Sequence, residues 1–224
     1  GIWHMPYCPT PLYYKVDGKK YFNERPISTQ QTAFSFVSQM RSWLPREMGG
    51  CFWFGNDDGN MIAYVPVYCS MTRLPECFNA PGANDITFSD KSAYWVCNWV
   101  SNMVYPRYSM LFPELKGYRD SLESSYFAKQ GEVEAKAKDL YARSAADAVK
   151  FLNDYSNTQA QQMLATWKDL AVRLIVRYND MAVKKMKGGK YLKTKYGLVE
   201  PVERPGYPTG YARKMIQLSK KDMQ

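Results

Sequence analysis

The chain has 224 residues, of which 46% are hydrophobic and 15% aromatic, as is typical of a folded globular protein and not of a disordered one. Its net charge of +9 comes almost entirely from residues 181–224, which hold 11 Lys and Arg against 3 Asp and Glu; the first 180 residues hold 19 against 18. The sequence shows no run of 18 apolar residues and no pattern of a nucleic-acid-binding domain, so we expect neither a membrane nor a nucleic acid as partner.

The first part of the chain has the patterns of strands. Residues 1–32 contain four prolines and few apolar runs, which predicts an extended segment. Apolar and polar residues then alternate over Ala33–Arg41, with Phe34 and Phe36 on one face and Ser35 on the other. This alternation predicts a strand.

A hairpin is predicted next, with arms at Cys51–Gly55 and Met61–Cys69. Between them, Asp57-Asp58-Gly59-Asn60 contains an Asp-Gly pair, which supplies the positive φ of a tight turn. Both arms are apolar almost throughout, as in strands that are covered on both faces. Pro66 has no N–H to donate and therefore predicts a bulge or an unpaired side.

Beyond Pro75 the apolar residues repeat every three or four positions, which predicts helices. Ser89 is expected to cap a helix that ends near Pro106, and a second helix is expected from Pro113 to Gly131. Shorter helices are predicted over Glu132–Tyr141 and Ala145–Asn153. The clearest stripe comes last and predicts a helix that ends at Gly188-Gly189; its residues are Ala160, Met163, Leu164, Trp167, Leu170, Ala171, Leu174, Ile175 and Tyr178.

Strands followed by helices predict an α+β fold, with the helices on one face of a mostly antiparallel sheet. We divide the chain into an extended segment with antiparallel strands (1–75), a helical region (76–180) and a basic tail (181–224). The tail has no periodicity, which indicates an irregular segment or a short edge strand. Its basic residues are expected to form a solvated surface.

The cysteines and the histidine show no spacing typical of a metal site. His4 is the single histidine, and no CxxC pair is present, so we expect no metal and no cofactor. Cys51, Cys69 and Cys97 lie within apolar runs, which favours buried thiols. A Cys69–Cys77 disulfide across a short loop stays open as an alternative. No GxSxG, Walker, GxGxxG or HExxH motif is present.

Arg41 is the main candidate for substrate binding. By alternation it shares a strand face with Gln39, and a guanidinium beside an amide and a Trp can hold a peptide carboxylate with two hydrogen bonds. A salt bridge or a surface Arg is an equal alternative for Arg41. Asn56 and Asp57 are weaker candidates, and we expect Asp57 and Asp58 to form a solvated turn rather than paired catalytic carboxylates or a metal site.

Four stretches resemble the later part of the bacterial cysteine dipeptidases of the dipeptidase A type, which are N-terminal-nucleophile hydrolases. They read RPISTQQTAFSFVSQMRSWLP, WFGNDD, YVPVYCSMTRLPECF and SAYWVCNWVSNMVYPRY. The resemblance covers roughly residues 1–180. It implies one sheet and one helix layer of an αββα sandwich, a dipeptide as substrate, a pocket lined by Arg41, and a secreted or periplasmic location.

Enzymes of this kind attack with the side chain of their first residue and use its α-amine as base. Here the first residue is Gly1, which has no side chain. The resemblance therefore implies that the chain is a C-terminal portion that is inactive alone, with its nucleophile on a missing N-terminal half or lost. The expected partner that supplies the second sheet is that missing half or a second copy.

Two alternatives from other classes are kept. In the first alternative, the chain is a non-catalytic relative that binds peptides or small amides in an aromatic cleft. In the second, it binds a nucleic acid or an anionic surface through residues 181–224. The second alternative depends only on the charge of the tail.

Overall fold

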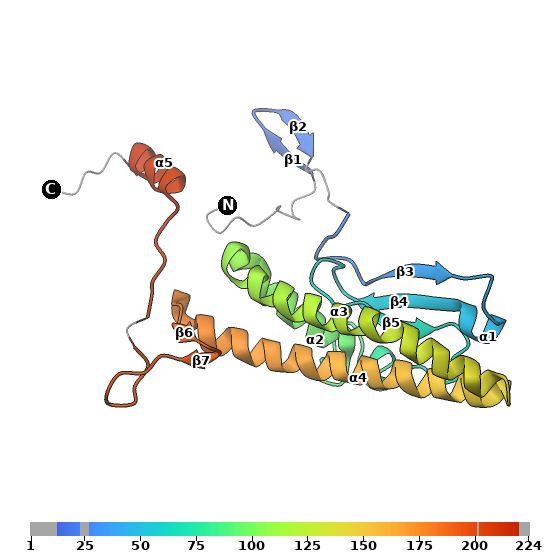
Figure 1. Cartoon of the computed structure of the whole chain (residues 1–224). Helices are drawn as coiled ribbons and strands as arrows, with labels where there is room; N and C mark the ends of the chain where they lie inside the picture. The colour runs from blue at the N-terminus through green and yellow to red at the C-terminus, as the bar shows by residue number, and fades with distance from the viewer. Residues whose placement is uncertain (1–12, 23–26, 201, 220–224) are drawn as a thin grey trace.

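A computed structural model describes residues 13–22, 27–200 and 202–219 (Figure 1). His4, Cys8 and the first part of the predicted extended segment lie outside these ranges. Within the segment, strands β1 (Tyr13–Val16) and β2 (Lys19–Phe22) form an antiparallel hairpin. The expectation of an extended segment is wrong here, because Asp17 and Gly18 both adopt positive φ, of 49° and 78°, and so form a tight turn.

The main sheet has three antiparallel strands in the order β3-β4-β5, which are Phe34–Met40, Gly50–Asn56 and Val65–Tyr68. The predicted strand at 33–41 is confirmed, and the two predicted hairpin arms pair with each other. The second arm begins at Val65 and not at Met61, so the connection is a loop over residues 57–64 and the predicted tight turn is wrong. A single helical turn, α1 (Arg46–Gly49), precedes β4. Pro66 lies in β5, an edge strand of this sheet, so its missing N–H leaves no gap in the ladder with β4.

Three helices cover this sheet. Helix α2 (Ala93–Val104) begins at Ser92, whose hydroxyl accepts a hydrogen bond from the backbone N–H of Trp95 at 3.4 Å, so the cap predicted at Ser89 is wrong by three residues. A short 3₁₀ turn at Tyr105–Arg107 leads into α3, which confirms the end near Pro106.

The four predicted segments after Pro113 form only two helices, α3 (Tyr108–Tyr141) and α4 (Ala145–Tyr178), each of 34 residues. Each is about 50 Å long at ~1.5 Å per residue. Gly131 does not interrupt α3, because Tyr126 and Val133 on either side of it are buried in the core. Packing of the two helices therefore overrides the weak helix propensity of glycine.

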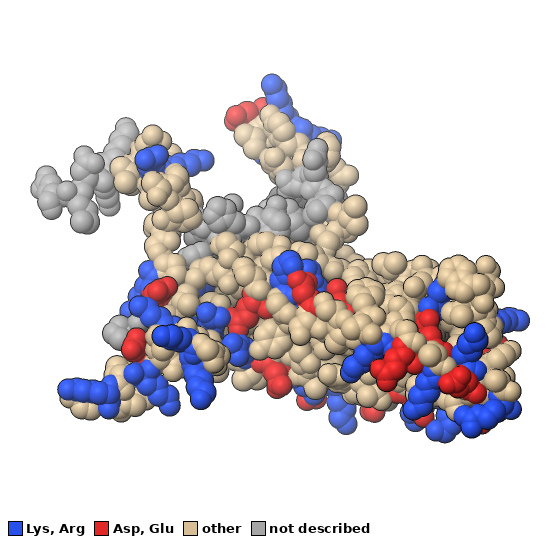
Figure 2. Space-filling model, in the orientation of Figure 1, with Lys and Arg blue, Asp and Glu red and all other residues tan. Residues whose placement is uncertain are grey.

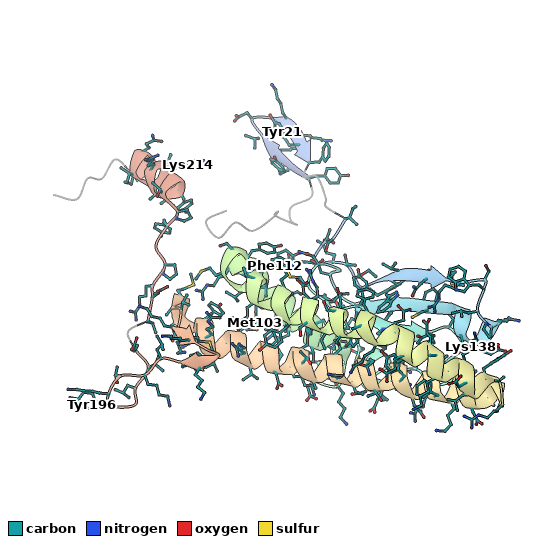
Figure 3. The ribbon with its side chains drawn as sticks, viewed as in Figure 1. Tyr21, Met103, Phe112, Lys138, Tyr196 and Lys214 are labelled. Carbon is teal, nitrogen blue, oxygen red and sulfur yellow. The ribbon has the colours of Figure 1, made fainter. Side chains whose placement is uncertain are left out.

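The end of the chain differs from the prediction. Helix α4 ends at Tyr178, and Gly188 and Gly189 instead form the turn between β6 (Met186–Lys187) and β7 (Lys190–Tyr191), with φ of 56° and 77°. The tail also contains a helix, α5 (Thr209–Ser219), where none was expected. In Figure 1 the β1–β2 hairpin and α5 stand away from the body, as do Tyr21 and Lys214 in Figure 3.

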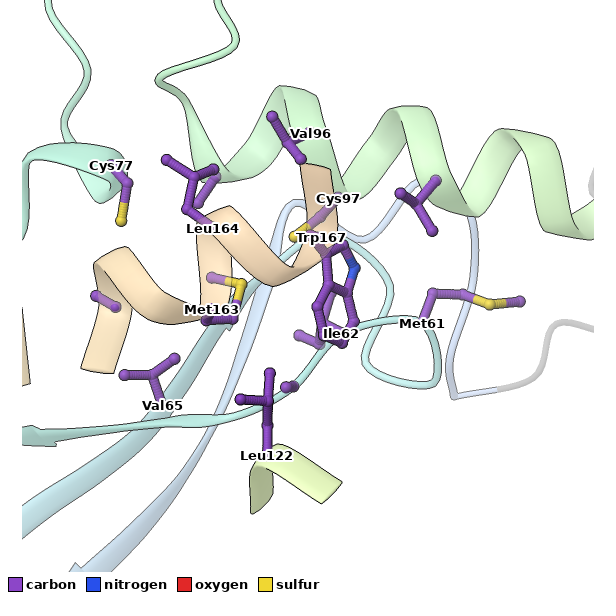
Figure 4. Packing of buried hydrophobic residues seen from close by; sticks show 14 of the residues in the cluster. Met61, Ile62, Val65, Cys77, Val96, Cys97, Leu122, Met163, Leu164 and Trp167 are labelled. Carbon is purple, nitrogen blue, oxygen red and sulfur yellow. The ribbon is translucent and has the colours of Figure 1, made fainter. Parts of the chain in front are cut away.

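The core lies between the sheet and the three long helices. Trp167 of α4 is fully buried at its centre, beside Ile62 of the β4–β5 loop, Cys97 of α2 and Leu122 of α3 (Figure 4). Glu114 of α3 also joins the helices, because its carboxylate accepts hydrogen bonds from Arg173, Arg177 and Tyr178 of α4.

The two faces of the sheet differ. One face packs on α3 and α4 and carries Gln39, Trp53 and Tyr68, whereas the other is open over much of its area. The exposed apolar side chains of this open face are Phe34 at 55%, Phe36 at 53%, Met40 at 68% and Phe52 at 38%. Phe36 and Phe52 contact each other with ring centroids 5.2 Å apart. The surface around β3 in Figure 2 shows few charged side chains.

The α+β class and the helices on one face of an antiparallel sheet are confirmed. The expectation that β4 and β5 are covered on both faces is wrong within the described residues, because Phe52 on β4 and its neighbours on β3 remain exposed. Among the described residues the main sheet is a single layer with no second sheet stacked on it, so the αββα sandwich stays a prediction. Among the described helices, none has the length and apolar character needed to cross a membrane.

The buried core predicts a large difference between two identical substitutions. Trp167→Ala removes a side chain that is 0% exposed and should lower the free energy of unfolding by about 3–5 kcal/mol. Trp43→Ala removes one that is 77% exposed and should change it by less than about 0.5 kcal/mol. Urea denaturation of both variants measures the two effects, and equal losses would contradict this assignment of the core.

Candidate functional site

Arg41 lies just beyond the end of β3 and is only 8% exposed. Its guanidinium forms an ion pair with Glu134 of α3 and donates to the carbonyl oxygens of Met48 at 3.2 Å and Gly49 at 3.4 Å. Gly49 must be glycine here, because a Cβ atom would lie 2.7 Å from the Arg41 carbonyl oxygen. The guanidinium is therefore held inside the protein by three partners.

Gln39 belongs to the same network. Its carbonyl oxygen accepts hydrogen bonds from Trp53 Nε1 at 3.2 Å and from Gln130 Nε2 at 2.7 Å. Gln130 also donates to Glu134, at 3.0 Å, and the hydroxyl of Tyr68 donates to Glu134 at 3.1 Å. The structure thus brings Gln39 and Arg41 together, as the alternation predicts. The same network joins β3 and β5 to α3.

Asp57 and Asp58 are both 0% exposed, so the expected solvated turn is wrong. Asp57 accepts hydrogen bonds from Asn98 Nδ2 at 2.8 Å and from Ser101 Oγ at 2.7 Å, both on α2. Burial raises the pKa of Asp57 from its ordinary 3.8 to about 6. The positive φ of the loop is at Asp57, with a value of 82°, and not at Gly59.

The neighbouring carboxylate is held in a similar way. Asp58 accepts hydrogen bonds from the hydroxyls of Ser28 and Tyr105 and from the backbone N–H of Asn60 at 3.0 Å. The two carboxylates therefore anchor the β4–β5 loop to α2 and to the segment before β3. They face different partners and do not form a catalytic pair.

The four candidate residues lie in two places. Gln39 pairs with Cys51 near the start of β4, whereas Asn56 is at the end of that strand. Five residues separate Cys51 from Asn56, which corresponds to roughly 17 Å at ~3.4 Å per residue. The described structure therefore does not bring Gln39 and Arg41 together with Asn56 and Asp57 around one small ligand.

Asn56 differs from the other three candidates. By alternation with Phe34 and Phe54 it belongs to the open face of the sheet. Its Oδ1 atom is buried and has no hydrogen-bond partner among the described residues. A buried acceptor without a donor is costly, so this atom is the unsatisfied polar group of the four candidates.

The described cysteines do not form an activated nucleophile. Burial raises the pKa of Cys51 and Cys77 to about 12 and that of Cys97 well above its ordinary value. These thiols are therefore protonated at neutral pH. Cys69 is exposed, and its pKa is also raised by desolvation. All four are free, so the alternative of a Cys69–Cys77 disulfide is wrong.

Residues 7–121, about half of the chain, match the sequence profile of Peptidase family C69. The chain belongs to this family. The resemblance to the cysteine dipeptidases of the dipeptidase A type is thereby confirmed. The matched region includes the sheet, α2 and the first part of α3.

One curated relative matches the chain over part of its own length. The probable dipeptidase B of Streptococcus pyogenes serotype M1 is 22% identical to the chain over 154 residues, which are 67% of this chain and 30% of the relative. The chain thus spans about a third of the length of this relative.

Several partners of the candidate residues could not be found from the sequence. Glu134 lies 93 positions after Arg41, Gln130 lies 91 positions after Gln39, and Asn98 and Ser101 lie more than 40 positions after Asp57. No local pattern marks such partners. The one available signal was the helical periodicity, which identifies buried faces but not the strand that each face contacts.

The Arg41–Glu134 pair gives a prediction on stability. Replacing one partner leaves the other charge buried, so Glu134→Leu should lower the free energy of unfolding by about 3–5 kcal/mol. The double variant Arg41→Met/Glu134→Leu should lose less than the sum of the two single changes, because no lone charge remains. Glu132→Leu, an exposed position on the same helix, is the control. Additive losses in a double-mutant cycle would contradict a coupled pair.

Asp57 gives a prediction on pH dependence. Because its pKa in the folded protein is about 6, above its ordinary 3.8, the stability it contributes is complete below about pH 4 and is lost as the pH rises through 6. The loss is about 3 kcal/mol at ~1.4 kcal/mol per pKa unit. Asp57→Asn has no ionisable group and tolerates a positive φ, so the variant should lack this decline. Denaturation between pH 4 and 7 measures it, and parallel curves would refute the assignment.

Proposed function

We propose that this chain is the supporting portion of a C69 cysteine dipeptidase, which hydrolyses dipeptides through a thioester formed on an N-terminal cysteine that lies outside the chain. The exposed apolar face of the main sheet carries this proposal. Phe34, Phe36, Met40 and Phe52 form an exposed apolar patch that only Ser38 interrupts on β3, and a folded sheet normally covers such a face. In the proposed enzyme a second sheet packs on it and completes the αββα sandwich.

The free edge of β3 supports the same proposal. Asp57 N donates to Ala33 O at 2.8 Å and Arg41 N to Gly49 O at 2.9 Å, so the odd-numbered residues of β3 bond to β4. The N–H and C=O groups of the even-numbered residues then point away from β4. No described strand pairs with this edge, which carries neither proline nor charge. Edges of this kind accept a further strand.

The chemistry is divided between the two portions in this proposal. The absent cysteine, activated by its own α-amine, attacks the peptide carbonyl, and water then releases the acyl group from the thioester. The described chain contributes no base of the imidazole type, because its single histidine is His4, outside the described residues. It contributes the sheet on which the dipeptide lies.

Among the four candidate residues, Asn56 is the substrate contact that we favour. By strand alternation it belongs to the open face, where the second sheet and the nucleophile would approach. Its Oδ1 has no donor among the described residues, and a turn of the amide toward that face would give it a peptide N–H as donor. Arg41, Gln39 and Asp57 would support the pocket from behind, since each is already engaged by α3, α2 or β4. They would set its shape without contacting the bond that breaks.

Activity assays test the proposal. The chain alone should not hydrolyse dipeptides that contain Ala, Leu or Met, because no described cysteine is an activated thiol. Co-expression with the polypeptide encoded directly before Gly1 should give a complex whose dipeptidase activity is abolished by iodoacetamide. In that complex Asn56→Ala should lower kcat/KM by about tenfold or more, the cost of one lost hydrogen bond in the transition state.

Phe36→Lys, on the open face, should prevent formation of the complex, whereas Val172→Lys on an exposed part of α4 should not. Turnover by the chain alone that iodoacetamide abolishes would contradict the proposed division. Peptide binding by the chain without activity in any combination would instead favour the non-catalytic alternative.

A further inference from the structure

A cavity of about 340 Å³ lies between β3 and α3, on the helix-covered face of the sheet. Val37, Gln39 and Trp53 line it from the strands, and Glu123 and Phe127 line it from the helix. Its volume is within the range of sites for small organic molecules. Because the open face is on the other side of the sheet, this cavity is separate from the dipeptide site proposed above.

Glu123 is the polar group of the cavity that lacks a complete set of partners. Its Oε1 atom accepts a hydrogen bond from the backbone N–H of Tyr64 at 3.0 Å, and its Oε2 atom has no partner among the described residues. Burial raises the pKa of this carboxyl group. The charged neighbours on the same helix are Arg119, which is bound by Asp120 and donates to the Asn60 carbonyl oxygen, and Asp120 itself. The half-buried carboxylate therefore forms no ion pair among the described residues, although the charge of Arg119 partly offsets the rise in its pKa.

Two aromatic rings complete the wall beside this carboxylate. The centroids of Trp53 and Phe127 are 4.6 Å apart, and Phe127 is 59% exposed although it is apolar. The aromatic faces attract cations and also bury apolar groups. The amide nitrogen of Gln39 donates to no described group, so it remains available to a ligand, whereas its oxygen is already engaged.

We propose that this cavity binds a primary ammonium ion attached to an apolar group. The ammonium pairs with Glu123, and the apolar group packs against Trp53 and Phe127. The free amino end of a peptide or of an amino acid derivative has this chemistry. An anionic ligand is disfavoured by the carboxylate, and a purely apolar ligand would leave Glu123 desolvated without a partner.

Calorimetric titration of the full chain tests the proposal with two matched probes. Phenylalanine amide carries an ammonium group and a phenyl ring, whereas N-acetyl-phenylalanine amide has the same ring and no charge. We expect saturable binding of the first with one site per chain, and binding of the second that is weaker by about tenfold or more, since a charge-assisted hydrogen bond is lost. The indole N–H resonance of Trp53 should shift with the first probe.

Variants localise the site. Glu123→Gln keeps the acceptor for the Tyr64 N–H and should weaken binding of phenylalanine amide by about tenfold or more. Phe127→Leu should weaken it by about threefold or more, as expected for a lost cation–π contact. Glu132→Gln, an exposed carboxylate on the same helix, should leave the affinity unchanged.

Three outcomes would overturn the proposal: equal binding of the acetylated probe, unchanged affinity in Glu123→Gln, or no saturable binding at millimolar concentration. The last outcome would leave the cavity to a polypeptide segment that pairs with β3. Phe127→Leu decides if Glu123→Gln does not fold, because Phe127 is largely exposed. None of these measurements depends on dipeptidase activity, so they are distinct from the tests of the proposed function.

Discussion

The structure depends on one constraint: helices cover one face of a small apolar sheet and leave much of the other face exposed. Strands β3, β4 and β5 bury one face under α3 and α4, and the hydrophobic contribution of that face comes from side chains such as Trp53 and Tyr68, which are 6% and 1% exposed. On the other face, Phe34 and Phe36 remain more than half exposed. Each exposed phenyl group forfeits part of the ~1.5–3 kcal/mol that full burial of such a side chain contributes. A second layer on this face, as in the sandwich proposed above, would bury these rings and recover that contribution.

The buried polar groups link the sheet to its helices at both ends. At one end Arg41 and Glu134 neutralise each other between β3 and α3, and at the other end Asp57 is held by Asn98 and Ser101 of α2. Such pairs add little net stability compared with apolar residues of the same size, but they exclude arrangements in which a charge remains buried alone. They fix how the strands lie on the helices. A substrate contact on the open face, such as the one proposed for Asn56, depends on this fixed position because it belongs to β4.

The main strands and the family resemblance were predictable from the sequence because their signals are local. Alternation located β3, and the family match covers the phrases around β4, β5 and α2. The predictions were wrong where the burial of a side chain depends on partners far away in the sequence. The carboxylates of Asp57 and Asp58 are typical of an exposed turn, yet donors more than 40 positions later bring them inside. The same limit applies to Arg41, because its partner Glu134 lies 93 positions away. In contrast, the hairpin turn at Asp17-Gly18 has a local signature, the Asp-Gly pair, so its position could be predicted from the sequence.

The two faces of the sheet have different consequences for ligands. A group that binds on the open face must share that space with a second protein layer, since Phe34, Phe36 and Phe52 offer a broad apolar surface and no enclosed cavity. A group that binds on the helix side meets a cavity that is already formed, with a carboxylate and two rings fixed by β4 and α3. The dipeptide site of the proposed enzyme therefore requires assembly of two portions, whereas the cavity at Glu123 does not. Gln39 belongs to the hydrogen-bond network around Arg41 and also lines this cavity. A ligand in the cavity would therefore contact β3, the strand that leads to Arg41 behind the proposed dipeptide site.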